Sequence, residues 1–270
     1  MVGTLYNSNS VNEPFLYGGG TMTILPTLGG TLGGYAFGVN DAGQVIGDAY
    51  VPGNTTQHAF LYSGGTTTDL TSLLSTSTLT LSDVRGINDS GQIAGTATTA
   101  SGYQHAVVDI AGALTDLGTL GGNSSEAFAI NDAGQVSGIS DTAANVEDIF
   151  LYSDGSMLDL GPAGFTPTGV YMNDLGQVVS GYYLNLFLYS GGTKTNLYSV
   201  MAPLHWLPYE VCGTNDSGQI VGFGADENIA GEPNRAFILT PTVPEPAALS
   251  LLAIAPAGLL RRPRAAKTPR

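Results

Sequence analysis

The residues of this sequence whose types could do chemistry recur in a decapeptide centred on Asn-Asp-x-Gly-Gln. Its copies are GVNDAGQVIG (38–47), GINDSGQIAG (86–95), AINDAGQVSG (129–138), YMNDLGQVVS (171–180) and GTNDSGQIVG (213–222). One interpretation is a cation loop, but the alternating Asp/Asn ligands of an EF-hand are missing, and one carboxylate per turn supports only weak Ca²⁺ binding. The other is a tight hairpin turn, in which Asn and Asp bond backbone amides just ahead and Gly takes a positive φ. Five occurrences favour the turn, because a catalytic centre occurs once.

Two further groups could bind a ligand. His58 and His105 hold one repeat position, which is filled in the other units by Glu13, Asp148, Asn185 and Arg235. If their strand were innermost, these side chains would form a polar ring around a central channel. Because no HxxxH or HxH spacing occurs, we favour solvated positions at a strand edge.

In the segment YSVMAPLHWLPYE (198–210), His205, Trp206 and Tyr209 could form a sugar-stacking loop. Packing at the end of the sheet stack is the favoured alternative.

Enzyme motifs are missing from the sequence. It contains no Gly-x-Ser-x-Gly, phosphate loop or dinucleotide fingerprint. We therefore predict no catalytic, cofactor-binding or metal-ligating residues. Paired carboxylates for glycoside cleavage can come from distant segments, so a polysaccharide hydrolase or lyase remains the alternative.

The charge of the chain is low in density and lopsided. Charged residues make up 11% of the 270 residues, against about 25% in an average domain. Before Val243 there are three basic residues and 21 acidic ones, a balance of −18, and from there on five basic residues and one acid give +4. An acidic body without clustered Lys and Arg excludes nucleic acid as a partner.

The spacing of the decapeptide defines a repeating unit. Its Asn falls at 40, 88, 131, 173 and 215, so the period is 48, 43, 42 and 42 residues. Each unit is expected to hold four strands, as in 35–39, 44–50, 58–62 and 66–70. Runs such as Ile-Phe-Leu-Tyr (149–152) are continuously apolar, so both faces of each sheet must be covered. Four-stranded units of this length predict an all-β protein, a β-propeller with about six units or an open β-superhelix.

The ends of the repeat domain (1–242) are irregular. Residues 2–6 match the second strand of a unit, and the last unit ends after its third strand at Leu239, so both end units are expected to be three-stranded.

The single cysteine, Cys212, excludes an intramolecular disulfide. It holds the position of Phe37, Arg85, Phe128 and Val170 in other units, which predicts a small buried side chain.

Residues 2–239 resemble the bacterial HAF-repeat proteins, an extracellular family. The resemblance is carried by the five decapeptides, by His58-Ala59-Phe60 and by DLGTLGG at 116–122. It implies a location and a form, and no enzymatic activity.

The tail, residues 243–270, resembles the PEP-CTERM sorting signal of Gram-negative bacteria. It begins with Val243, Pro244, Glu245 and Pro246, continues with an apolar stretch and ends in a basic cluster, Arg261, Arg262 and Arg264. The resemblance implies transient retention at the inner membrane, processing by an exosortase-type enzyme and delivery to the cell surface or the exopolysaccharide matrix. As a helix, the 14 residues 247–260 would span about 21 Å, short of a bilayer core of about 30 Å. The arginines would stay cytoplasmic.

The N-terminus does not match this export route. MVGTLYNSNSVNEPF has neither the basic start nor the apolar core of a signal peptide. Together with the half unit at 2–6, this favours a shortened reading frame or a misplaced start, and with a genuine start the product would stay in the cytoplasm. We therefore expect an exported repeat protein with a structural or binding role, no intrinsic enzyme activity, and exopolysaccharide as the candidate partner.

Overall fold

The computed structural model describes residues 1–162, 169–181, 185–226, 234–241 and 251–256. These residues form six antiparallel sheets, named A to F here, in which neighbouring strands follow one another along the chain. Sheet A contains β1 (Val2–Tyr6), β2 (Asn12–Gly18) and β3 (Thr21–Ile24), and sheet B contains β4 (Gly34–Val39), β5 (Val45–Tyr50), β6 (Gln57–Ser63) and β7 (Thr66–Asp69). Sheet C contains β8 (Leu79–Ile87), β9 (Ile93–Thr99), β10 (Gln104–Ile110) and β11 (Ala113–Asp116). Sheet D contains β12 (Gly121–Ile130), β13 (Val136–Thr142), β14 (Glu147–Ser153) and β15 (Ser156–Pro162). Sheet E contains β16 (Val170–Met172), β17 (Val178–Ser180), β18 (Phe187–Ser190) and β19 (Thr193–Asn196), and sheet F contains β20 (Trp206–Thr214), β21 (Ile220–Asp226), β22 (Arg235–Pro241) and β23 (Leu251–Pro256).

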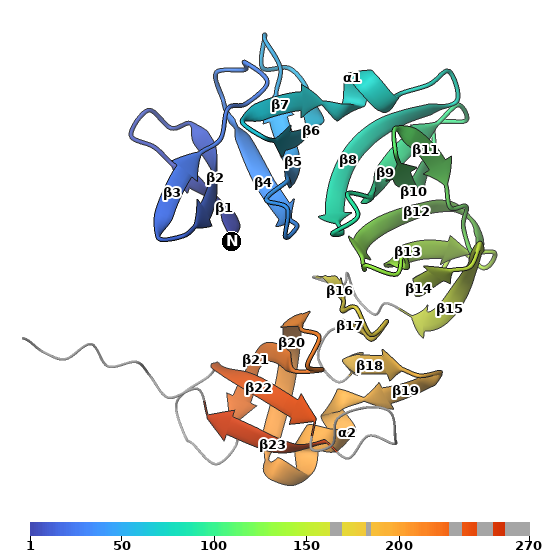
Figure 1. The fold of residues 1–270 in the computed structure, drawn as a ribbon. Coiled ribbons are helices and arrows are strands. Elements are labelled where there is room, and N and C mark those ends of the chain that lie inside the picture. The colour runs from blue at the N-terminus through green and yellow to red at the C-terminus, as the bar shows by residue number, and fades with distance from the viewer. Residues whose placement is uncertain (163–168, 182–184, 227–233, 242–250, 257–270) are drawn as a thin grey trace, which may run out of the picture.

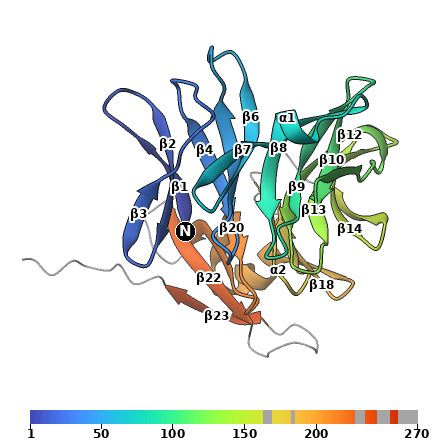
Figure 2. The ribbon, with the colours of Figure 1, turned by 45° about the horizontal axis from the view of Figure 1, so that its top comes forward.

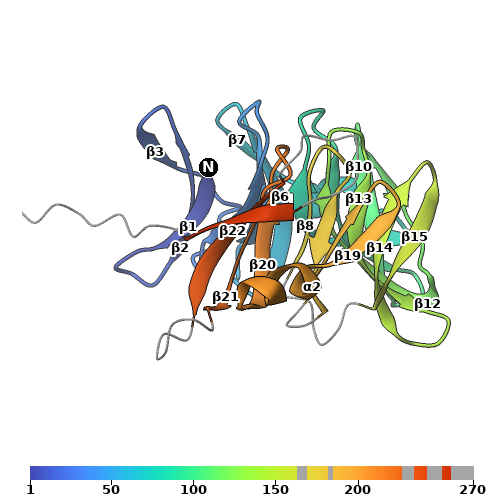
Figure 3. The same ribbon diagram turned by 90° about the horizontal axis from the view of Figure 1, so that it is seen from below.

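The sheets stand around a common centre in chain order, with sheets A and F at the two ends of the arc (Figure 1). The first strand of each four-stranded sheet is the innermost (β4, β8, β12, β16 and β20), and turned views show the sheets side by side (Figures 2 and 3). This radial arrangement is that of a β-propeller, and it confirms the predicted fold class. The open superhelix was the other alternative.

Apolar side chains fill the space between successive sheets. Four clusters of buried residues connect B with C, C with D, D with E, and E with F. In the continuous run of β14, Ile149, Phe150 and Leu151 are all buried, although successive side chains point to opposite faces. Both faces of the sheet are therefore covered, as the sequence predicted.

Two short helices follow the last strands of sheets B and E. Asp69 caps α1 (Leu70–Leu74) by accepting from the Ser72 amide, and Asn196 caps α2 (Leu197–Met201) by accepting from the Ser199 amide. A 3-10 helix, η2 (Ala202–Leu204), then leads into β20, beside which α2 lies (Figure 3). Each α-helix buries two apolar side chains between its own sheet and the next, so it closes the outer part of that interface.

Two expectations about the chain ends meet different outcomes. Sheet A is three-stranded, as predicted. Sheet F has a fourth strand, because Leu251–Pro256 pairs antiparallel with β22, with Leu239 opposite Ile254. The prediction of a three-stranded last unit is therefore wrong, and so is that of a helix over 251–256. The reason is that a short apolar segment ending in Pro256 makes a poor isolated helix, whereas the edge of β22 offers backbone partners. Residues 247–250 and 257–260 lie outside the described residues.

Candidate functional site

The decapeptides are tight hairpin turns between the first and second strands of five sheets. In each turn the Gly has a positive φ, between 71° and 77° at Gly43, Gly91, Gly134, Gly176 and Gly218. The Asn side chain bonds to the Gln four residues on, as where Gln44 N donates to Asn40 Oδ1 at 3.0 Å and Asn40 Nδ2 donates to Gln44 Oε1 at 2.7 Å. The predicted turn is confirmed, and its Asn and Gln hold each other in place.

The same turns also connect each sheet to the next. Asn40 Nδ2 donates to the Asn88 carbonyl at 3.0 Å, and the equivalent bonds run from Asn88 to Asn131, from Asn131 to Asn173 and from Asn173 to Asn215 at 2.9, 3.3 and 2.8 Å. Beside them, the amide of each Asp donates to the carboxylate of the next Asp: Asp41 to Asp89, Asp89 to Asp132, Asp132 to Asp174 and Asp174 to Asp216, at 2.8–2.9 Å. We call this double series the Asn-Asp ladder.

The Asn-Asp ladder gives a structural role to the recurring Asn and Asp residues whose types could have formed a reactive site. Its four donor asparagines are 3–7% exposed, and each Asp carboxylate from Asp89 onwards accepts from the sheet before. The carboxylates were expected to bond amides just ahead in their own turn, and instead they accept from another sheet. In the part of the chain that the structure describes, no group of three or more His, Cys, Asp or Glu side chains could hold a metal ion.

The position three residues before each ladder Asn is a β-bulge in four of the five sheets. The pairing skips one residue at Phe37, Arg85, Phe128 and Cys212. At Cys212 the bulge turns the side chain away from the sheet core. Cys212 is therefore exposed, and the prediction of a buried thiol is wrong. Partial desolvation of the otherwise exposed thiolate, and then the nearby charge of Glu210, raise the pKa of Cys212, which disfavours the reactive form.

A group of charged side chains lies near the bulges of sheets B to D. Arg85 pairs with Asp83, with Nη2 and Oδ2 2.8 Å apart, and its guanidinium lies 4.9 Å from the centre of the Phe37 ring. Burial, and then the charge of Asp83, raise the pKa of Asp48 to about 7, although Arg85 opposes the shift. Burial, and then the charge of Asp83, also raise the pKa of Glu126, and Arg85 again opposes the shift. A carboxyl group whose pKa lies near 7, like that of Asp48, is of the kind that can act as a general acid.

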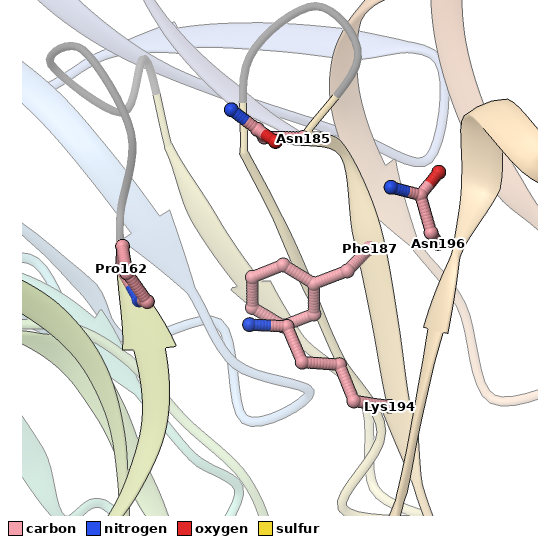
Figure 4. Close-up of a pocket in the computed structure, with 5 residues that line it drawn as sticks. All are labelled: Pro162, Asn185, Phe187, Lys194 and Asn196. Carbon is pink, nitrogen blue, oxygen red and sulfur yellow. The ribbon is translucent and has the colours of Figure 1, made fainter.

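A cavity of about 460 Å³ is lined by Pro162, Asn185, Phe187, Lys194 and Asn196, from sheets D and E. The Lys194 ammonium lies 4.0 Å from the centre of the Phe187 ring and donates to the Leu160 carbonyl, with Pro162 across the opening (Figure 4). Burial lowers the pKa of Lys194, while the nearby Asp148 and Asp159 oppose that shift. The volume lies in the range of small-molecule sites. Among the described residues that line it, the polar side chains are the amides of Asn185 and Asn196 and the ammonium of Lys194.

The histidines lie away from the centre of the ring. His58 and His105 are on β6 and β10, the third strands of their sheets, so the condition for a polar ring around the axis is not met. His58 Nδ1 lies 2.8 Å from Asp69, and His105 Nδ1 lies 2.8 Å from Asp116. Each histidine thus joins its strand to the end of the neighbouring strand. In sheet B, hydrogen bonds from Ser72 and His58 outweigh the effect of burial and lower the pKa of Asp69.

The aromatic segment is divided between surface and core. Trp206 is 6% exposed and packs edge-on against Phe237 with ring centres 6.2 Å apart. His205 is exposed with φ 61°, and Tyr209 is half-buried. The indole is therefore covered rather than presented to a sugar, which favours the packing role.

The residues of the sorting motif, Val243 to Pro246, and the basic cluster, Arg261, Arg262 and Arg264, lie outside the described residues. No helix in the described part of the chain is long and apolar enough to cross a bilayer.

Comparison with known proteins identifies the fold. No family model matches the chain, and no curated protein sequence matches it. Among solved structures, it is similar to a TolB-like protein from Agrobacterium tumefaciens, with a TM-score of 0.52 and 11% identity over 82% of this chain and 80% of the other. TolB from Acinetobacter baumannii is similar with a TM-score of 0.55 and 13% identity over 88% of this chain and 60% of that one. A puromycin-hydrolyzing peptidase from Mycobacterium tuberculosis gives 0.55 and 13% over 92% of this chain and 42% of that one.

These similarities agree with the six sheets. The chain is a β-propeller-like repeat protein. At identities of 11–13% they show the fold alone. Because a peptidase is among the similar structures, the fold does not decide between a binding protein and an enzyme.

Proposed function

We propose that this chain is an exported repeat protein that acts at the cell surface or in the exopolysaccharide matrix, as a structural element that also binds saccharide. The observation that carries the proposal is the Asn-Asp ladder. It uses the recurring Asn and Asp side chains to join sheets, so these residues build a scaffold and do not converge on a reactive centre. The part of the chain before Val243 has few charged residues but a net charge of −18, which is compatible with a hydrated, extracellular setting.

The cavity beside Lys194 is the proposed saccharide site. The Lys194 ammonium already bonds the Leu160 carbonyl and lies near two acids, so its charge is locally neutralised and suits a neutral sugar better than an anionic one. Asn185 is exposed, lines the cavity and carries both donor and acceptor groups, which sugar hydroxyls require.

A binding assay on neutral and acidic polysaccharides tests this site. We expect Lys194→Met, which keeps the aliphatic contact with Phe187, and Asn185→Ala to weaken retention on the neutral polysaccharide about tenfold. Arg85→Met is the matched control, because it removes an equal charge far from the cavity. Equal retention of all three variants and the unaltered chain would contradict the saccharide site.

The sorting role of residues 243–270 rests on the resemblance of the tail to a sorting signal, and it needs a variant that spares β23. With a signal peptide supplied, replacing Pro244, Glu245 and Pro246 by Ala leaves Leu251–Pro256 intact. We expect this variant, like one that lacks residues 243–270, to be released into the medium and to escape the exosortase-type enzyme. Replacing Arg261, Arg262 and Arg264 by Gln should weaken the transient membrane retention. Unchanged localisation of the Pro-Glu-Pro variant would count against the sorting role.

A propeller-type polysaccharide hydrolase or lyase is the second candidate. It is favoured by Asp48 and Glu126, the two carboxyl groups near Arg85 whose pKa values are raised. Turnover of a polysaccharide that is abolished by Asp48→Asn or Glu126→Gln, with unchanged thermal stability, would establish this function in place of the first.

A further inference from the structure

Sheet D carries two acids at a place where sheets B and C carry a histidine and an acid. In sheets B and C, a histidine on the third strand lies 2.8 Å from an aspartate on the fourth strand, in the pairs His58–Asp69 and His105–Asp116. The equivalent positions in sheet D hold Asp148 and Asp159, because Asp159 lies opposite Phe150 just as Asp69 lies opposite Phe60. Sheet D therefore brings two carboxyl groups together without the histidine donor.

The carboxyl group of Asp148 is poorly satisfied in this pair. Asp148 is 8% exposed, and its Oδ1 is buried with no hydrogen-bond partner among the described residues. Asp159 Oδ1 accepts from the Gly161 amide at 2.6 Å, and the two carboxyl groups share a side-chain hydrogen bond. Such a bond needs a proton on one of the two acids. Burial, and then the charge and the hydrogen bond of Asp159, raise the pKa of Asp148, although Lys194 opposes the shift.

The pair acts on the cation of the cavity between sheets D and E. The Lys194 ammonium donates to the Leu160 carbonyl and lies 4.0 Å from the centre of the Phe187 ring (Figure 4). A Cβ on Gly161 would lie 3.1 Å from Lys194 Nζ, so the ammonium lies against the backbone that also holds Asp159. Among the described residues no close ion pair joins Lys194 to either acid, so the acids act on its charge through space.

The other groups around Asp148 leave this set of three charges separate. Ser140, which lies opposite Asp148 on β13, carries no charge. Glu147 precedes Asp148 on β14 and therefore points to the other face of the sheet. There, burial and then the charges of Asp141 and Glu126 raise the pKa of Glu147. The charge beside the cavity is thus decided by Asp148, Asp159 and Lys194.

We propose that Asp148 sets the charge selectivity of the cavity beside Lys194, by an effect on the ammonium and not by contact with the ligand. With both acids ionised, two negative charges oppose the one positive charge of Lys194, and the cavity excludes anionic saccharides. With one proton on the pair, the charges balance and an anionic group is accepted at Lys194. The inference rests on the proposed saccharide site and names the class of saccharide that it rejects.

Retention of the full chain on immobilised dextran sulfate, with dextran as the uncharged counterpart, tests the proposal. At pH 7 we expect Asp148→Asn to raise retention on dextran sulfate about tenfold and to leave retention on dextran unchanged. Asp148→His, which recreates the pair of sheets B and C, should show the same gain. Asp154→Asn is the matched control, because it removes an equal charge at an exposed turn of the same sheet. Adding Lys194→Met to Asp148→Asn should abolish the gain.

The pH dependence of retention separates this role from a structural one. Sulfate esters stay ionised over the range used, so only the protein changes its charge. As pH falls from about 7 to about 5, retention on dextran sulfate should rise more for the unaltered chain and for Asp154→Asn than for Asp148→Asn. The reason is that only a pair with both acids takes up the additional proton.

The outcomes distinguish this inference from the proposed function. Equal retention of Asp148→Asn and Asp154→Asn on dextran sulfate would overturn the selectivity, and so would a gain that persists with Lys194→Met or identical pH profiles of the three chains. If neutral polysaccharides still retain the unaltered chain in that case, the saccharide function stands without this inference. A gain in Asp148→Asn that depends on Lys194, in a chain that no neutral polysaccharide retains, would support the charge control and refute the saccharide function.

Discussion

Asn88 is the position at which the role of the ladder can be measured most sharply, by Asn88→Ala. Its side chain donates to the Asn131 carbonyl at 2.9 Å and to Gln92 Oε1 at 2.7 Å, and accepts from the Gln92 amide at 2.9 Å. It is 3% exposed, so water cannot replace these partners. At about 1 kcal/mol for each hydrogen bond, and more for a buried group left unpaired, the substitution should lower the free energy of unfolding by about 3 to 5 kcal/mol.

The matched control is Asn215→Ala. Asn215 makes the corresponding two bonds with Gln219 and also accepts from the Ser217 amide, but it is exposed and makes no described bond to another sheet. Its replacement should cost about 1 kcal/mol. Urea unfolding followed by circular dichroism measures both values. If the two substitutions cost the same, the buried asparagines would serve only their own turns, and the reasoning would be refuted.

Three further predictions concern single residues. Because the pKa of Asp48 is raised to about 7 in the fold, the protonated form is favoured there, and the free energy of unfolding should fall as pH rises from about 4 to 7. Asp48→Asn should reduce this fall by about 2 to 4 kcal/mol in urea titrations at several pH values, whereas Asp154→Asn at an exposed turn should leave it unchanged. Parallel pH profiles of the unaltered chain and both variants would contradict this prediction. Gly47→Ala should destabilise the fold by about 3 kcal/mol in thermal melts, because the added Cβ would lie 1.9 Å from the Tyr35 carbonyl oxygen. The control is Gly18→Ala, whose Cβ meets nothing within 4 Å and should leave the stability unchanged. Equal melting temperatures of the two variants would argue against the close approach at Gly47. Cys212 should react with a disulfide reagent in the native state, because its side chain is exposed. The reaction should be slower than that of free cysteine at pH 7.5, because the pKa of Cys212 is raised. Labelling only after unfolding would refute the exposure of the thiol.

The recurring pattern was enough to predict the architecture. Its spacing located the strands of sheets B to E and the first three strands of sheet F, and the match of residues 2–6 to a second strand predicted the three-stranded sheet A. Continuous apolar runs predicted sheets covered on both faces, because that inference needs only the alternation of side chains along a strand.

The bonds between sheets could not be obtained from local patterns. The side chains of an Asn-Asp-x-Gly-Gln turn can find hydrogen-bond partners within the turn itself. Nothing within the decapeptide therefore shows that Asn40 also bonds Asn88 of the next sheet. The signal that could have found it is the repetition of both residues at one position of every unit, which would bring them together once the units stack. The exposure of Cys212 was missed for a related reason, since a bulge changes the direction of a side chain without a mark in its residue type.

The tail illustrates a competition that sequence alone does not settle. An apolar stretch can form a helix or a strand, and its choice depends on whether an edge with free backbone groups is near. The strand β22 supplies that edge in sheet F, where Leu251–Pro256 pairs with it. Likewise, the cavity beside Lys194 comes from residues of sheets D and E that have no shared motif.

Residue-resolved hydrogen exchange at the five turns tests the central claim most directly. The amides of Asp41, Asp89, Asp132 and Asp174 each donate to the Asp carboxylate of the next sheet at 2.8–2.9 Å, whereas the Asp216 amide has no such acceptor among the described residues. The account predicts four slowly exchanging aspartate amides and one fast one, although all five turns lie at the surface. Equal, rapid exchange at all five would contradict a scaffold built by bonds between the turns.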